Sequence, residues 1–367
     1  MGDDIKVSII IPVYRYSENL KNLLSTLLHD KYSNKEIIIV VDEPTPDFFN
    51  LNGLEKCKVI IHEKRVGKVQ SLNEALKVAS GDYYLFLDSD VEVPEGFVSK
   101  ALNEAIRAGT DVIDFIKLGK GASFIGKMAS IDYALFNFFY EISSKFNRKI
   151  FALDGAAFMI KAESMKKIGG FERFYSEDLQ LGLRTYLNNM SYYLTNIKIR
   201  VLQPKNLKDW ADQRIRWGYG LAEWAFNNIL DILKSLLYSP WFLLAVLIFV
   251  VTPLTSMGLF YLVSSPIVNA YLMINMINPL IKSYPWLSKF PRIDIMSGFD
   301  FLMVFLGTFL ISIVLYSVIV HRYEGSLNLK DLILYYFVYQ PMLSIAYLIG
   351  FTFYLAKLNP TFNWKKD

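Results

Sequence analysis

The chain has 367 residues, 53% of them hydrophobic, and its mean hydropathy of +0.27 is too high for an ordinary soluble enzyme. Its single cysteine excludes an internal disulfide, and its three histidines are too scattered to offer a zinc-binding spacing. The net charge of +4 comes without clustered basic runs, so we expect no nucleic-acid partner and interpret the charge as contact with an inner membrane leaflet.

Short β-branched runs alternate with helical stretches from residue 5 to residue 115. The expected strands are residues 6–14, 35–42, 58–64 and 83–90, and the helical stretches between them include 17–30 and 68–81. This alternation predicts an α/β fold with a parallel sheet covered by helices. Open sheets of this kind bind ligands at the carboxyl ends of their strands.

Distinctive residues stand where three of these strands end. The first strand ends with Pro12 and Tyr14, the second with Asp42, and a later one with Asp88 and Asp90. Side chains at i and i+2 of an extended chain point the same way, so the last two carboxylates are expected to project together and to need a partner. One acidic pair at a strand end is more often solvated than catalytic, but the three ends together favour a nucleotide site.

Two later segments are expected to be helical. Residues 176–187, "SEDLQLGLRTYL", begin with acids that suit a helix N-terminus, so Asp178 has two interpretations, as a capping residue and as a catalytic base. Residues 206–235 place Arg214 and Trp217 on one helical stripe shortly before an apolar segment. That pattern is typical of a helix lying at a membrane surface.

The last third of the chain carries the apolar excess. Four uncharged stretches are predicted to cross a bilayer as helices: 236–263, 264–281, 301–320 and 332–356. The second stretch contains three asparagines, and hydropathy alone does not decide whether it spans. If it does, the basic residues of the following loop and of the C-terminal tail share the side of the N-terminal domain, as the positive-inside rule prefers.

The expected domains follow from these segments. They are an N-terminal domain (1–205), an interfacial helix region (206–235) and a transmembrane domain of about four helices (236–367). The apolar run after the charged opening "MGDDIK" is too short for a secretory signal, so we expect a multi-pass protein of the cell membrane whose N-terminal domain is cytoplasmic.

A series of motifs resembles the family 2 glycosyltransferases with the GT-A fold. In chain order they are "SIIIPVY", "GKVQSLNEAL", "SGDYYLFLDSD", "IGGF", "SEDLQLGLR" and "QRIRW". DxD alone is weak, but DxD, an acidic ED pair and QxxRW in this order are hard to obtain by chance. QxxRW is similar to the motif of the membrane-embedded branch that includes cellulose, chitin and hyaluronan synthases, and ceramide glucosyltransferases carry a related signature.

The resemblance implies a donor site and a base. A hard divalent ion, Mg²⁺ or Mn²⁺, would neutralise the diphosphate leaving group and would be held by Asp90 and Asp88. Asp178, beside Glu177, would be the general base of an inverting transfer. The nucleotide sugar would be bound by Pro12, Tyr14, Asp42, Lys68 and Asp88. Residues 42–47, "DEPTPD", depart from the commoner D-D-x-S-x-D pattern.

The resemblance also implies an acceptor site. The QxxRW motif would close the active site, with its last arginine on the diphosphate and its indole stacked on the acceptor; the motif residues are Gln213, Arg214, Arg216 and Trp217. Asp154 and Gly155 are weaker candidates for lining the acceptor side.

Three classes of function compete. The first is a synthase that adds sugars, with a UDP-sugar as the expected donor, to a growing glycan at the membrane. The second is a non-processive enzyme that glycosylates a lipid or a polyprenyl-linked acceptor. The third is a membrane-bound binding protein on an inactive scaffold, which is disfavoured because every expected catalytic residue is present. QxxRW favours the polymer class, but four helices make a sparse channel unless subunits associate, so a homo-oligomer is also expected.

Overall fold

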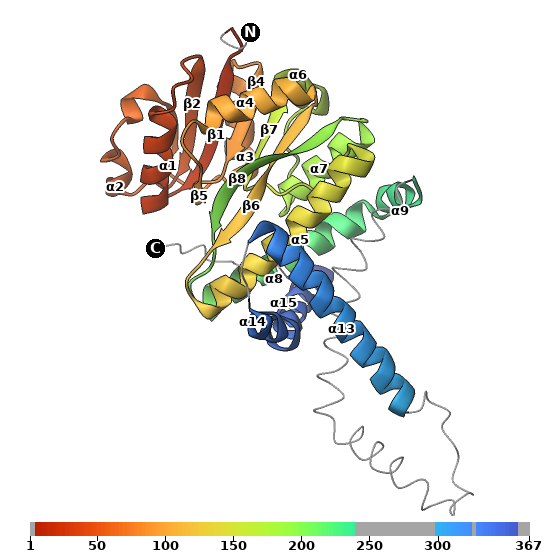
Figure 1. The fold of residues 1–367 in the computed structure, drawn as a ribbon. Coiled ribbons are helices and arrows are strands. Elements are labelled where there is room, and N and C mark those ends of the chain that lie inside the picture. Colours follow the sequence, from red (N-terminus) through yellow and green to blue (C-terminus); the bar gives the residue numbers. More distant parts are fainter. Residues whose placement is uncertain (1–3, 239–297, 325–327, 359–367) are drawn as a thin grey trace, which may run out of the picture. The chain divides into compact units, whose positions relative to one another are not determined.

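The computed structural model describes residues 4–238, 298–324 and 328–358. The chain divides into two compact units, one formed by residues 1–241 with 347–367 and the other by residues 242–346. The first unit contains a mixed sheet with the strand order β3-β2-β1-β4-β7-β6-β8-β5 (Figure 1).

The first half of this sheet is parallel, as the alternating pattern predicts. Its strands are β1 (Val7–Tyr14), β2 (Lys35–Asp42), β3 (Lys58–His62) and β4 (Tyr83–Leu87). β1 lies between β2 and β4, and β3 forms the outer edge beside β2. Helices α1 (Glu18–Leu28) and α3 (Lys68–Val78) form the connections between these strands, where helical stretches are expected.

The second half contains strands that run in both directions. β7 (Ala157–Lys161) is antiparallel to both of its neighbours, β4 and β6 (Val112–Lys120). β8 (Tyr192–Leu202) is parallel to β6, and the short β5 (Val91–Glu92) pairs with β8 in the antiparallel direction. The segment before β7 therefore returns to the sheet edge at which β4 ends.

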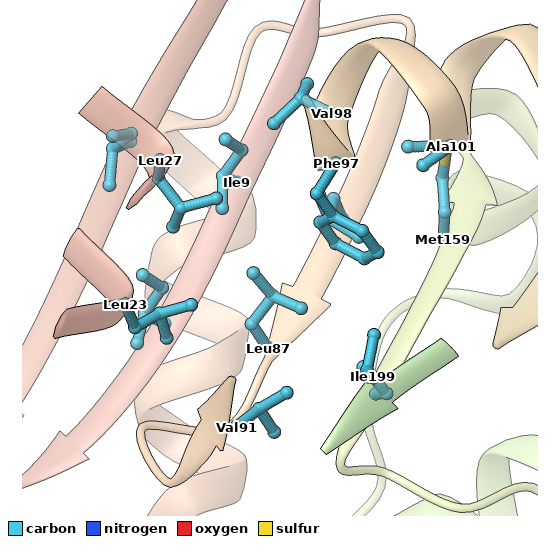
Figure 2. Close-up of a cluster of buried hydrophobic side chains, with 14 of the residues drawn as sticks. Ile9, Leu23, Leu27, Leu87, Val91, Phe97, Val98, Ala101, Met159 and Ile199 are labelled. Carbon is cyan, nitrogen blue, oxygen red and sulfur yellow. The ribbon is translucent and has the colours of Figure 1, made fainter. Parts of the chain in front are cut away.

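Alternating side chains of the strands build the core on one face of the sheet. β1 contributes Ile9 and α1 contributes Leu23 and Leu27, which lie together with Leu87 and Phe97 in a cluster of buried side chains (Figure 2). The other face of β1 is also buried, since Ile10 is fully covered. Burial on both faces explains why these strands read as continuous apolar runs.

The remaining helices of the first unit connect its strands or follow β8, the last strand in the chain. They are α2 (Pro46–Phe49), the 3-10 turn η1 (Leu54–Lys56), α4 (Phe97–Ala108), α5 (Phe124–Ile142) with its π-helical end η2 (Ser143–Asn147), α6 (Ala162–Ile168), α7 (Glu177–Leu187), α8 (Leu207–Asn227) and α9 (Ile229–Tyr238). α7 and α8 correspond to the two later segments expected to be helical.

The described C-terminal residues form long apolar helices. α13 spans Gly298–Tyr323, and α14 (Leu329–Leu334), η5 (Tyr335–Tyr339) and α15 (Gln340–Leu355) follow one another directly. Among the described residues, Leu306–Tyr323 and Leu329–Leu355 are long and apolar enough to cross a membrane. They overlap the predicted spans 301–320 and 332–356. The predicted spans 236–263, apart from residues 236–238, and 264–281 lie outside the described residues.

Candidate active site

The carboxyl ends of the parallel strands meet at one edge of the sheet. Tyr14 at the end of β1 is level with Asp42 of β2, which is level with His62 of β3. β4 lies on the other side of β1 and ends at Leu87, so Asp88 follows at the same edge. The structure thus brings together the strand ends that the sequence singles out.

The carboxylate of Asp42 is buried and organises the start of α3. It accepts hydrogen bonds from the backbone N–H groups of Val66 (3.1 Å) and Gly67 (2.8 Å), and it contacts Nδ1 of His62 (2.9 Å). The other ring nitrogen of this histidine contacts Glu74 at 2.7 Å. Because two backbone donors bind Asp42, the acid fixes the turn that presents Lys68 at the first position of α3.

Lys68 joins two motifs that lie about ninety residues apart in the sequence. Its Nζ lies 2.8 Å from Asp88 and 2.9 Å from Glu177. Partial enclosure lowers the pKa of Lys68, but the charges of the surrounding carboxylates outweigh this and hold the pKa well above its usual value. This ammonium therefore stays charged and holds the DxD and ED motifs together.

The prediction that Asp88 and Asp90 lie on one extended strand end is wrong. β4 ends at Leu87, and residues 88–90 form a turn, closed by a hydrogen bond from the N–H of Val91 to the carbonyl of Asp88 (3.3 Å). The turn arises because Val91 starts β5, which pairs with β8. The charges of Asp88 and Asp90 still interact. Enclosure and the charge of Asp90 raise the pKa of Asp88 to about 6, although the positive charge of Lys68 lowers it.

Asp178 lies in the first turn of α7 and faces the segment before β7. Its Oδ2 accepts a hydrogen bond from the N–H of Gly155 (2.9 Å), and Oδ1 accepts one from the N–H of Leu179 (2.8 Å). Ser176 occupies the capping position, but its side chain makes no capping hydrogen bond. Enclosure and the neighbouring charge of Glu177 raise the pKa of Asp178 to about 7. A carboxylate with such a pKa suits a general base near neutral pH.

The absence of a side chain at Gly155 permits this arrangement. A Cβ at this position would lie 3.0 Å from Cβ and 3.1 Å from Oδ2 of Asp178. The preceding Asp154 bonds locally, since its Oδ1 accepts a hydrogen bond from the N–H of Ala156 (2.8 Å). Gly155 thus matters to the site as a backbone donor and a close contact.

One face of α8 is turned towards the start of α7. A Cβ at Gly220 would lie 2.2 Å from Oγ of Ser176, and Glu223 accepts a hydrogen bond from the N–H of Tyr175 (2.7 Å). Arg216 lies on the same stripe by helical spacing. Sequence reasoning missed Gly220 and Glu223, although their spacing of four and seven residues from Arg216 places all three on one face.

The two arginines of the QxxRW motif have different surroundings. Enclosure lowers the pKa of Arg216 to about 10. Four carboxylates of the site act in the opposite direction and raise this pKa: Glu177, Asp178, Asp88 and Asp90. Arg214 is fully buried instead, and its guanidinium lies 2.8 Å from Asp132 of α5. Arg216 therefore interacts with the acidic residues of the site, whereas the ion pair between Arg214 and Asp132 joins α8 to α5.

The remaining motif residues lie beside Arg214. The Arg214 guanidinium stands 4.0 Å from the ring centroid of Trp217 and donates a hydrogen bond to Oε1 of Gln213 (3.3 Å). The Trp217 ring is partly exposed and lies 6.5 Å from the ring of Phe136. The cation orients the indole by covering part of its surface.

A small pocket is lined by some of the predicted donor residues and by the predicted base, but not by Asp42 or Asp90. Its lining includes Pro12, Lys68, Asp88, Gly155, Glu177 and Asp178. Tyr14 lies at the same sheet edge, and its ring stands 4.7 Å from the guanidinium of Arg65 and 5.0 Å from that of Arg15. Both arginines are exposed and were missed by the sequence reasoning, although Arg15 directly follows Tyr14 and Arg65 lies two residues before the motif "GKVQSLNEAL".

The acidic residues of this site fit a divalent cation that substrate phosphates would help to hold. Within the described ranges, no group of three or more His, Cys, Asp or Glu side chains could hold a metal ion. Asp88 and Asp90 supply hard oxygen donors, and enclosure, the main cause of the raised pKa of Asp88, disfavours its negative charge unless a cation lies nearby. Mg²⁺ is commonly bound by one or two carboxylates together with substrate phosphates, so this donor set fits.

Comparisons with known proteins show what the chain is similar to. Residues 8–169 match the family model "Glycosyl transferase family 2". A probable glycosyltransferase of Sulfolobus acidocaldarius is 27% identical over 246 residues, which cover 62% of this chain and 52% of that protein. Poly-β-1,6-N-acetyl-D-glucosamine synthase of Staphylococcus epidermidis is 24% identical over 238 residues, covering 62% and 58%. The chain thus matches somewhat more than half the length of these relatives.

A solved structure shares the fold. The mannosyltransferase PcManGT from Pyrobaculum calidifontis, in complex with GDP-Man and Mn²⁺, superposes with a TM-score of 0.56 at 14% identity, covering 97% of this chain and 88% of that chain. Residues 8–169 are thus similar to a glycosyltransferase family 2 domain, and the α/β fold is GT-A-like.

Proposed function

We propose that this protein is an inverting, metal-dependent glycosyltransferase that moves a sugar from a nucleotide diphosphate to a hydroxyl group of a membrane-associated acceptor. One observation carries the proposal: Lys68 bridges Asp88 and Glu177 in the pocket that Asp178 also lines. The residues that would hold the donor phosphates thus lie next to a carboxylate able to accept a proton.

The reaction requires a base on the acceptor side. Asp178 accepts the proton of the acceptor hydroxyl as that oxygen bonds to the anomeric carbon, while the bond from this carbon to the diphosphate oxygen breaks and its electron pair leaves with the nucleotide. The N–H of Gly155 holds Oδ2 of Asp178 in place during this step. A carboxylate with a pKa of about 7 is half in its basic form at neutral pH.

Two cationic side chains are placed to bind the leaving group. Lys68 is held by the acids of both motifs, and the positive charge of Arg216 interacts with those acids and with Asp90. A divalent ion held by Asp88 and Asp90 would add Lewis-acid stabilisation of the diphosphate charge. The proposed donor is a UDP-sugar, on the strength of the family resemblance.

The pKa of Asp178 favours a hydroxyl acceptor over a phosphate. A phosphate group is already largely ionised near pH 7 and needs no base, whereas a hydroxyl group does. The name of the staphylococcal relative supports a glycan acceptor, so a polysaccharide synthase is the first candidate. Transfer to a hydroxyl of a lipid would use the same residues and is the alternative.

We place this reaction at the cytoplasmic face of a cell membrane. Support comes from α13, whose described part exposes large apolar side chains: Leu310, Ile311, Val314 and Val318 are each at least 60% exposed. Water is a poor environment for such a surface, and lipid is a good one. The proposed protein is multi-pass, with its N-terminal domain on the cytoplasmic side.

A transfer assay tests the proposal directly. The full chain, purified in detergent, is incubated with labelled UDP- and GDP-sugars and with Mg²⁺ or Mn²⁺, and polymer is then separated from lipid-soluble product. We expect one donor to label one product class, and we expect the Asp178→Asn variant to bind the nucleotide without making product. Donors left intact by a folded protein that binds nucleotide would refute the proposed activity.

A further inference from the structure

The second half of α15 packs directly against α8, the helix that carries the QxxRW motif. α8 and the chain from residue 347 onwards belong to the same compact unit. A Cβ at Gly350 of α15 would lie 2.5 Å from the backbone nitrogen of Tyr219, and a Cβ at Gly218 of α8 would lie 2.7 Å from Cα of Tyr347. These distances are too short for a side chain, so the two helix backbones meet at a pair of glycines.

Another side of α8 is equally close to the start of α7. A Cβ at Gly220 would overlap the hydroxyl group of Ser176. Residues two apart on a helix do not share a face, so Gly218 and Gly220 let α8 approach α15 on one side and α7 on another. Glycine inside a helix is destabilising relative to alanine, and the close approach on both sides explains why it is present here.

Three tyrosine rings continue the contact from α15 to the proposed base. The ring centroid of Tyr354 on α15 lies 5.5 Å from that of Tyr219, and the centroid of Tyr219 lies 4.6 Å from that of Tyr175. The hydroxyl group of Tyr354 also accepts a hydrogen bond from Nδ2 of Asn227 on α8 (3.3 Å). Tyr175 stands three residues before Asp178, so the row of rings ends beside the first turn of α7.

The start of α7 is also hydrogen-bonded to α8. The N–H of Tyr175 donates to Glu223 (2.7 Å), and Nδ2 of Asn228, the C-cap of α8, donates to Oε1 of Gln180 (2.9 Å). Arg216 lies on the same stripe of α8 as Glu223, seven residues earlier. A shift of α8 would therefore move this arginine together with the turn that carries the base.

We propose that α15 is part of the active site's framework: the crossing at Gly218 and Gly350, with Tyr354, fixes the position of α8. α8 in turn places Arg216 and Asp178. The first three are positioning residues, since none of them is among the described residues that line the pocket. The inference rests on the proposed function for the roles of the arginine and the base. It gives the last apolar helix a part in catalysis in addition to membrane attachment.

The variant Gly350→Ala tests the crossing. The helices would have to separate by about 1 Å before the new methyl group reached an ordinary contact distance from the nitrogen of Tyr219. A misplacement of about 1 Å far from the reacting atoms can cost about a hundredfold in rate. Gly307→Ala is the matched control, because a Cβ at this glycine of the apolar helix α13 meets nothing within 4 Å among the described residues.

The first readout does not depend on activity. Hydrogen exchange of the Tyr175 amide, which Glu223 protects, is followed by mass spectrometry with single-amide fragmentation in the full chain in detergent. We expect exchange about tenfold faster than the wild type in Gly350→Ala, at the wild-type rate in Gly307→Ala, and unchanged for the amides of β1 in both. A folded Gly350→Ala protein whose Tyr175 amide exchanges like the wild type would overturn the proposal.

The second readout is kcat for sugar transfer per donor-binding site, with the sites counted by calorimetry. A contact that served folding alone would lower the number of sites and leave the rate of each unchanged. We expect the rate per site to fall about tenfold or more in Gly350→Ala. Tyr354→Ala should lower it as well, and Tyr354→Phe, which keeps the ring, should restore it. Wild-type rates per site in both Gly350→Ala and Tyr354→Ala would refute a positioning role.

The two readouts separate this inference from the proposed function. Faster exchange at Tyr175 in Gly350→Ala, in a protein that transfers no sugar to any acceptor, would support the role of the crossing and refute the proposed activity. Wild-type exchange in a Gly350→Ala protein that transfers sugar at the wild-type rate would refute the role of the crossing alone.

Discussion

Replacing Asp178 with asparagine should stabilise the protein at alkaline pH. The pKa of this carboxyl is raised from 3.8 to about 7, first by enclosure and then by Glu177. The folded state therefore binds the proton more tightly than the unfolded chain does. As a result, the ionised side chain destabilises the fold fully above pH 7, and this penalty fades as the pH falls towards 4.

The size of the stabilisation follows from the shift in the pKa of Asp178. Three pKa units correspond to about 4 kcal/mol at 1.36 kcal/mol per unit, which is an upper bound because the side chain is partly exposed. The asparagine would lose one of the two hydrogen bonds from backbone N–H groups, at a cost of about 1 kcal/mol. The expected net gain is therefore about 1 to 3 kcal/mol at pH 8, or roughly 2 to 10 °C in Tm.

The assay is thermal unfolding of the wild type and of Asp178→Asn in one detergent, without nucleotide and with EDTA, from pH 5 to pH 8. The variant's advantage should grow with pH. Asp4→Asn, at an exposed position distant in sequence, is a control for the effect of removing one charge. An Asp178→Asn difference that is constant over this range would refute a raised pKa.

Three further outcomes are expected. Asp90→Ala should abolish turnover by removing a metal ligand, and EDTA should do the same reversibly in the wild type; full activity in excess EDTA would contradict this. Gly155→Ala should lower kcat at least tenfold, since its Cβ would lie 3.0 Å from that of Asp178, and kcat measured with donor binding checks this. Trp217→Ala should reduce transfer roughly tenfold to a hundredfold more than donor hydrolysis by water; an unchanged ratio of the two rates would exclude acceptor stacking.

Local pattern was sufficient to predict the parallel half of the sheet. The runs that become β1 and β2 are apolar, are rich in β-branched residues and end at conspicuous polar positions, so their bounds were predicted closely. The insertion of β7 between β4 and β6 was not predicted, because it depends on pairing between residues seventy or more positions apart in the sequence. That pairing is what brings Gly155 to the site.

Contacts between distant segments also limited the prediction of the site residues. The motifs indicated that Asp88 and Asp178 belong to one site, but the bridge through Lys68 is a contact between distant segments and has no local signature. The different positions of Arg214 and Arg216 could have been predicted, since residues two apart on a helix point to nearly opposite sides. The turn at residues 88–90 could not, because it depends on the pairing of β5 with β8.

Separating donor binding from sugar transfer in the Asp178→Asn variant tests the central claim most directly. Binding of the nucleotide sugar is measured by calorimetry, and transfer is measured with labelled donor in the same preparation. The account predicts a donor Kd within about threefold of the wild type and a loss of transfer of at least a hundredfold, because general-base catalysis typically contributes 10² to 10⁴. Transfer at the wild-type rate by this variant would contradict the assignment of Asp178 as the base.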